Sequence, residues 1–68
     1  MDVNVAMLNE EMAKKGWTIS DLAVKSNVDK STISRLLDGR CCSVSTAQKI
    51  VKALGISSRK AGLIFFGD

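Results

Sequence analysis

The residues best suited to chemistry with a ligand lie in the segment NVDKSTISRLLDGR, residues 27–40. Its apolar residues at positions 33, 36 and 37 follow the i, i+3, i+4 spacing of one helix face. The opposite face then carries Lys30, Ser31, Thr32, Ser34 and Arg35. Arg can donate two hydrogen bonds to guanine, Ser and Thr hydroxyls bond to several bases, and the Thr methyl can contact thymine. This face could therefore read base edges in duplex DNA.

A solvated helix surface is the alternative for the same polar face. Such surfaces usually carry Glu and Lys pairs at i, i+4, and residues 30–37 contain none. Short side chains also let a helix approach the floor of a groove. The composition of the face thus favours base contact, with Ser31, Thr32 and Arg35 toward the bases and Lys30 and Ser34 at the edges.

Positive charge is concentrated in and after this segment. Residues 26–60 carry seven Lys or Arg against two Asp, whereas residues 1–25 carry three Lys against four acidic residues. The whole chain of 68 residues has a net charge of +3. This asymmetry favours a polyanionic partner.

Helix start and stop signals divide the chain into five short helices, with no proline and no strand-like alternation. The first helix has Val5, Leu8 and Met12 on one face. The second begins with a capping box formed by Thr18 and Asp21. The third is expected to begin at Asp29, whose carboxylate would accept a backbone N–H. The fourth begins at Ser43 (or, as the alternative box, at Ser45 with Gln48), and the fifth at Ser57. The expected inward residues of the last two are Ala47, Ile50, Val51, Leu54, Ala61, Ile64 and Phe65.

The segment 19–38 meets the positional demands of two helices that cross through a tight turn. Ala23 gives a small residue at the crossing, and Asn27 tolerates the left-handed conformation that the turn requires. Val28 fills the turn, while Ile33 and Leu36 aim back at the first helix. Residues 19–38 are therefore predicted to form a helix-turn-helix.

The stretches WTISDLAVKSNVDKSTISRLLDGR and STAQKIVKALGIS resemble the Cro/repressor (XRE-like, lambda repressor-like) family of bacterial and phage helix-turn-helix regulators. The resemblance covers roughly residues 5–66. It implies an all-α, five-helix DNA-binding domain spanning residues 1–68, whose third helix, about residues 30–37, enters the major groove. It also implies a transcriptional regulator, most simply a repressor, that binds a two-fold operator as a dimer. Two residues differ from the family's pattern. Ile19 stands where family members often carry Gln, and Asp38 stands where they often carry a neutral or basic residue.

Several groups around this helix are expected to contact phosphates. Arg40 follows the helix directly, and Thr18, Ser20 and Ser43 lie at helix N-termini, where backbone amides attract anions. Four further cations are expected only to face solvent: Lys49, Lys52, Arg59 and Lys60. Trp17 is expected to pack between the first two helices.

The C-terminal block at residues 63–66 is too apolar for one short helix to bury. With Ile64 and Phe65 inward, Leu63 and Phe66 would face outward, and an exposed apolar patch suggests a homodimer interface. The alternative is a C-terminal helix that folds back and covers part of the patch.

The composition argues against an enzyme. The chain has no His, its carboxylates are expected at the surface, and the adjacent Cys41 and Cys42 are expected to be reduced thiols in a loop. No cofactor, metal ion or small-molecule ligand is expected. No apolar run approaches the roughly 20 residues of a membrane helix, so a cytoplasmic, nucleoid-associated protein is expected. The alternative function is a helical protein-interaction module, such as an antitoxin-like or anti-regulator domain.

Overall fold

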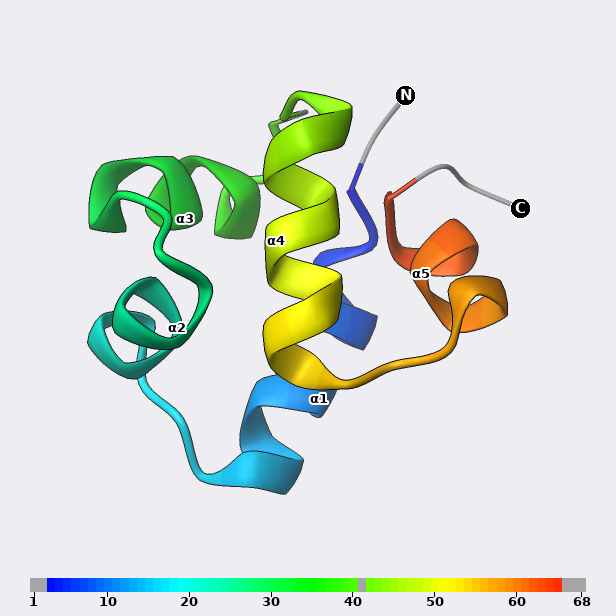
Figure 1. Ribbon diagram of the computed structural model, residues 1–68, viewed down its shortest axis with the longest axis horizontal. Helices are drawn as coiled ribbons and strands as arrows, with labels where there is room; N and C mark the ends of the chain where they lie inside the picture. The colour runs from blue at the N-terminus through cyan, green and yellow to red at the C-terminus, as the bar shows by residue number, and fades with distance from the viewer. Residues whose placement is uncertain (1–2, 41, 66–68) are drawn as a thin grey trace.

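The computed structural model describes residues 3–40 and 42–65, and the regular structure in these ranges is helical throughout (Figure 1). The elements are α1 (Val5–Lys15), α2 (Ile19–Ser26), α3 (Lys30–Leu37), α4 (Val44–Leu54) and α5 (Ser58–Phe65). The predicted all-α fold of five helices is thereby confirmed. Cys41 and Phe66, which the sequence singled out, lie outside the described residues.

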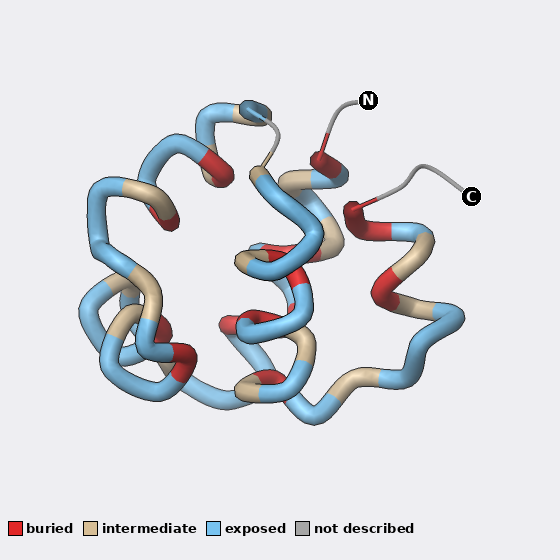
Figure 2. The backbone as a smooth tube through the Cα atoms, turned by 45° about the horizontal axis from the view of Figure 1, so that its top comes forward, coloured by how far each residue is buried: buried red, intermediate tan, exposed pale blue. Residues whose placement is uncertain are grey.

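Helix α4 is the central element of the molecule. It lies between α2 and α3 on one side and α5 on the other (Figure 1), and it packs directly against α2 and α5. Helix α1 packs against α3 and α5. All five helices contribute buried residues to one hydrophobic core, and Figure 2 marks these positions along the backbone. The largest fully buried side chains are Leu8, Leu22, Ile33, Leu36, Ile50, Leu54 and Ile64.

The predicted helix starts are largely confirmed. Thr18 and Asp21 form a reciprocal capping box. The Ser43 hydroxyl accepts the Thr46 N–H at 3.2 Å, which settles the start of α4 in favour of Ser43. The Ser57 hydroxyl accepts the Lys60 N–H, also at 3.2 Å.

The prediction for Asp29 was wrong in one respect. Asp29 is the N-cap of α3, but its side chain makes no cap hydrogen bond. Only its backbone carbonyl accepts helix amides, from Thr32 and Ile33. The Asp29 carboxylate is left at the surface.

The N-terminal segment contributes a core residue that periodicity did not indicate. Val3 is buried, whereas Val5, predicted as the first inward residue of α1, is only half-buried. The backbone N–H of Asn4 donates to the carbonyl of Ile64 at 2.7 Å. This bond holds the segment before α1 beside the end of α5, and so turns Val3 inward.

The expectation that the carboxylates lie at the surface was wrong for Glu11, which is buried. Its carboxylate pairs with Lys60 of α5 at 2.8 Å and with Lys14 at 3.2 Å. The hydrogen bond from Lys60 is the main reason that the pKa of Glu11 is lowered, aided by Lys14 and opposed by desolvation. Lys60 therefore connects α1 to α5 and is not a purely solvent-facing cation.

In the described ranges, no helix combines the length and the apolar character needed to cross a membrane.

Replacing Glu11 tests this connection between α1 and α5. We expect Glu11→Gln to lower the free energy of unfolding at pH 7 by about 1.5 kcal/mol, because two ammonium groups lose a charged acceptor. The lowered pKa makes this contribution complete above the ordinary value of 4.5 and lost progressively as pH falls below it. Urea unfolding at several pH values should show the difference from wild type shrinking toward pH 3.

Glu10→Gln is the matched control, since its side chain is 65% exposed and lies 3.6 Å from Lys14. It should change stability by less than about 0.5 kcal/mol. An equal loss for both variants, or a loss at Glu11 that does not depend on pH, would contradict the assignment.

Candidate nucleic-acid interface

The turn between α2 and α3 has the predicted geometry. Asn27 adopts a left-handed conformation with φ of 57°, the only positive φ outside glycine in the described ranges. The N–H of Val28 then donates to the carbonyl of Ala23 at 3.2 Å, closing the end of α2. Val28 and Ala23 are half-buried and pack against the core. The turn thus fixes the angle at which α3 leaves α2.

Helix α3 divides into an anchored face and an exposed face. Ile33 and Leu36 are buried and Leu37 is half-buried. Four of the five predicted base-reading residues are exposed, and Thr32 is half-buried at the flank. The exposed four are Lys30, Ser31, Ser34 and Arg35. The packing of one face therefore presents the polar residues of α3 together on the outside.

The end of α3 places Arg40 at a fixed position relative to Arg35. Gly39, with φ of 90°, reverses the chain, and its N–H donates to the carbonyl of Leu36 at 2.9 Å. The N–H of Arg40 donates to the carbonyl of Arg35 at 3.0 Å. These two bonds form the Schellman pattern of a helix end. Both Arg side chains are exposed, with exposed Asp38 between them in sequence.

The helix N-termini differ in what they can offer an anion. At α2 the hydroxyl and the N–H of Thr18 both donate to the Asp21 carboxylate, at 3.2 and 2.9 Å. The positive end of α2 therefore already has an intramolecular anion. At α4 the Ser43 hydroxyl lies 3.0 Å from that of Thr46. Ser20 and Ser43 are both exposed; Ser20 is next to Asp21 in sequence, whereas α4 contains no acidic residue.

Trp17 packs as predicted, and two cations accompany it. Its ring is half-buried against the core. The ammonium of Lys15 lies 5.4 Å from the ring centroid and that of Lys25 lies 6.0 Å from it. Cation–π attraction at such distances holds both lysines near the α1–α2 junction. Sequence spacing gave no signal for the pairing with Lys25, because that residue lies in the last turn of α2 and reaches the ring only through the fold.

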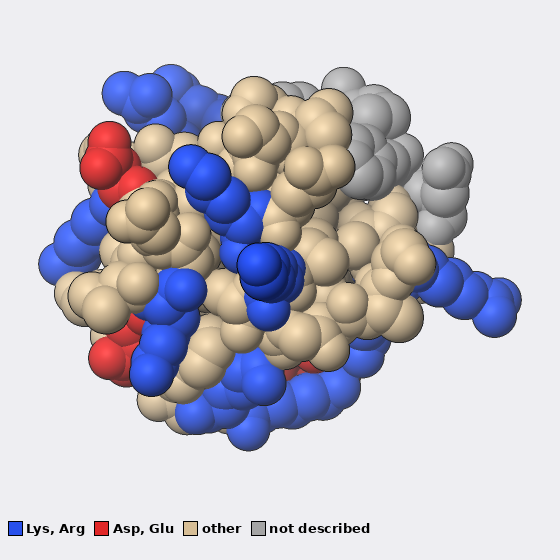
Figure 3. Space-filling model, viewed as in Figure 1, with Lys and Arg blue, Asp and Glu red and all other residues tan. Residues whose placement is uncertain are grey.

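The surface charge is broad rather than confined to one patch. Lys and Arg side chains extend over α4 and around the side of the molecule formed by α2 and α3 (Figure 3). Acidic side chains on the same face are few (Figure 3). Within residues 3–40 and 42–65, no group of three His, Cys, Asp or Glu could hold a metal ion. The arrangement of charge is suited to a polyanion.

Two short helices crossing through a left-handed turn, with the second presenting polar side chains, define a helix-turn-helix DNA-binding domain. A family model described as "Helix-turn-helix" matches residues 8–60. The chain belongs to the Cro/repressor-type helix-turn-helix family, whose members are DNA-binding regulators. No curated protein and no solved structure matches it.

The left-handed turn can be tested at Asn27. Asn27→Gly should keep or slightly raise the free energy of unfolding, because glycine adopts positive φ without strain. Asn27→Val should lower it by about 1–2 kcal/mol, since a β-branched side chain opposes this conformation. Thermal unfolding measured by circular dichroism gives both values.

The matched control is Asn9→Val at an exposed position in the middle of α1. Asn and Val have similar helix propensities, so little change is expected there. If Asn27→Val is as well tolerated as Asn9→Val, the turn does not depend on the left-handed residue.

Proposed function

We propose that this chain is a sequence-specific transcriptional regulator, most simply a repressor, that reads an operator with α3 in the major groove. The observation that carries the proposal is the exposed polar face of α3, held outward by the burial of Ile33 and Leu36. A major groove about 12 Å wide admits one helix and displays a distinct pattern for each base pair. A regulator of this kind acts in the cytoplasm of a bacterium or phage-infected host, at the nucleoid.

The side chains of α3 suit different groups on the DNA because they differ in length and in hydrogen-bonding capacity. Arg35 is suited to guanine, because its guanidinium can donate to both O6 and N7. Ser31 and Ser34 are short enough to let the helix backbone lie close to the bases. Half-buried Thr32 offers its methyl to a thymine at the edge of the face. Lys30, in the first turn, reaches either a base or the adjacent backbone.

Phosphate contacts would hold α3 in register. Arg40 is the strongest of these candidates, because its backbone is hydrogen-bonded to that of Arg35. Ser20 and Ser43 lie at helix N-termini and add neutral donors. Thr18 is the weakest, since its hydroxyl already donates to Asp21. Asp38 opposes a phosphate near the end of α3 by its charge.

A homodimer would allow two copies to read a two-fold operator. Leu63 on α5 is 39% exposed, one of the large apolar side chains left at the surface. We place it in the dimer interface with Phe66, which lies outside the described residues. A two-fold interface brings the same patch of both copies together, and a dimer sets the spacing of the two half-sites.

Arg35 and Arg40 should differ in the kind of binding energy they contribute. Arg35→Ala should weaken binding to the best site by about 1–3 kcal/mol and relax base preference at one position per half-site. Arg40→Ala should weaken binding to all sequences alike and reduce the slope of log affinity against log salt by about one. Fluorescence anisotropy with labelled duplexes over a salt series measures both effects.

Each variant serves as the control for the other, because both remove an exposed guanidinium. Unchanged affinity of Arg35→Ala on the best site would remove Arg35 from base reading. A loss at Arg40→Ala confined to one sequence would make it a base contact.

The dimer is tested by Leu63→Glu with Val24→Glu as the control. Val24 lies on α2 and is 80% exposed, so both substitutions place a carboxylate on an exposed apolar residue. Sedimentation equilibrium should show at least about tenfold weaker self-association for Leu63→Glu, because burying a charge is costly, and no change for Val24→Glu. Wild-type protein that stays monomeric over the same concentrations would rule out this interface.

A further inference from the structure

Two carboxylates at the ends of α3 have no partner among the described residues. Of the other acidic residues in these ranges, Glu10 and Glu11 pair with lysines, and Asp21 belongs to the capping box of α2. Asp29 and Asp38 are exposed, and neither side chain makes a hydrogen bond or an ion pair with a described residue. Asp29 is the N-cap of α3 and Asp38 is its C-cap.

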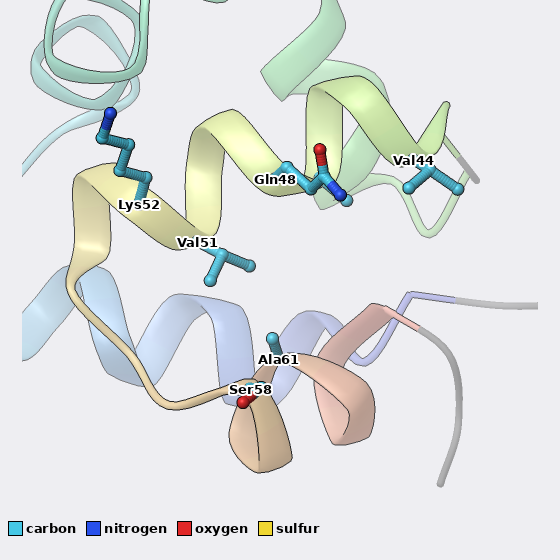
Figure 4. Close-up of a pocket in the computed structure, with 7 residues that line it drawn as sticks. Val44, Gln48, Val51, Lys52, Ser58 and Ala61 are labelled. Atoms are coloured by element: carbon cyan, nitrogen blue, oxygen red, sulfur yellow. The ribbon is translucent and has the colours of Figure 1, made fainter.

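Helices α4 and α5 have a different surface, because neither contains an acidic residue. The groove between them is lined mainly by apolar side chains. Its charged lining residue, Lys52, extends away from α5 (Figure 4). Within the described ranges, unpaired negative charge is therefore found only at the two ends of the helix that we propose to enter the DNA.

Negative charge in this place opposes DNA binding unless it meets a hydrogen-bond donor. A carboxylate only accepts hydrogen bonds, and the phosphates on both sides of the major groove repel it. The donors in this groove are the amino groups of cytosine, at N4, and of adenine, at N6. Adenine also presents the N7 acceptor beside its amino group, whereas cytosine presents the amino group alone. A single carboxylate at the base edges therefore suits cytosine.

The two ends of α3 differ in their access to base edges. In helix-turn-helix proteins the N-terminal residues of the second helix contact the bases, and Asp29 directly precedes the first turn of α3. Asp38 lies at the opposite end, where Gly39 reverses the chain toward Arg40. Asp29 is therefore the carboxylate expected at a base, and Asp38 the one expected near the phosphate backbone.

The backbone of Asp29 is held in place although its side chain is uncommitted. Its carbonyl accepts the N–H of Thr32 at 3.0 Å and that of Ile33 at 3.1 Å. Ile33 is fully buried, and Val28, the residue before Asp29, packs against the core. The carboxylate therefore projects from a fixed point at the start of α3, and binding a base would order only its own side chain.

We propose that Asp29 is a specificity-determining residue, whose carboxylate accepts a hydrogen bond from the N4 amino group of a cytosine in each operator half-site. The inference rests on the proposed function, because it requires α3 to lie in the major groove. Asp29 and Arg35 are six residues apart, about 9 Å along a helix, so they read base pairs about three steps apart. Thymine is rejected at the Asp29 position, because its O4 acceptor stands where cytosine has the amino group.

The test uses the full chain and duplexes of its selected operator in which each cytosine is changed in turn to thymine. For the wild-type protein, one such change about three base pairs from the guanine of Arg35 should weaken binding by at least about tenfold. With Asp29→Ala the same change should weaken binding by less than about twofold. Asp29→Asn should favour adenine at this position, because an amide bonds to both N6 and N7. Fluorescence anisotropy measures each affinity.

Asp38→Asn is the matched control, because it removes the same charge from the other end of α3. It should tighten binding to all duplexes alike, by up to about fivefold, and leave base preference unchanged. If the guanine preference depends on Arg35 but every cytosine preference survives Asp29→Ala, this inference alone is wrong. If wild-type protein selects no operator, both this inference and the proposed function are wrong.

Melting temperatures check that the Asp29 carboxylate is not needed by the fold. Ser43→Ala removes a side-chain cap hydrogen bond and should lower the melting temperature by about 4–8 °C. Asp29→Ala should lower it by less than half as much, because no cap hydrogen bond is lost. Equal losses for the two variants would show that the Asp29 carboxylate caps α3 and would overturn the proposal.

Discussion

The burial of Ile33 and Leu36 is the constraint on which the proposed DNA-binding surface depends. Both side chains are essentially inaccessible to water, in a helix only eight residues long. Burying two such side chains stabilises the fold by roughly 1.5–3 kcal/mol each. An isolated helix of this length is not stable in water. Helix α3 therefore exists because it packs on α1 and α2, and the same packing decides which residues it presents to a ligand.

The ends of the short helices are specified as firmly as their core. The left-handed residues Asn27 and Gly39 close α2 and α3, each through a hydrogen bond from the following amide to a carbonyl five residues back. Because these hydrogen bonds fix the direction of the chain at the end of each helix, the backbone of Arg40 has a fixed position relative to the polar face of α3. The proposed recognition surface is thus positioned by backbone geometry on both sides of α3, and its exposed side chains are left available for a partner.

Most of the fold could be predicted from the sequence, because its signals are local. Thr18 and Ser43 as caps, the turn at Asn27 and the inward Leu22, Ile33 and Leu36 follow from spacing alone. The failures involve contacts between distant segments. Val3 and Glu11 are buried only because α5 returns to α1, where the Asn4 N–H reaches Ile64 and Lys60 reaches Glu11. Residue type also does not specify whether a side chain at an N-cap makes the cap hydrogen bond, as Asp29 shows.

The candidate site was predictable as a set of exposed residues, since exposure follows from the same periodicity as the core. What each residue contributes depends on neighbours that only the fold reveals. Thr18 shows this, because its hydroxyl and N–H are both committed to Asp21.

Selection of bound sites from a pool of random duplexes tests the central claim most directly. The account predicts enrichment of one sequence with two-fold symmetry, affinity that falls steeply with salt, and a guanine in each half-site whose enrichment is lost with Arg35→Ala. A pool that yields no enriched sequence, or one whose enrichment is the same with Arg35→Ala, would contradict the reading role of α3.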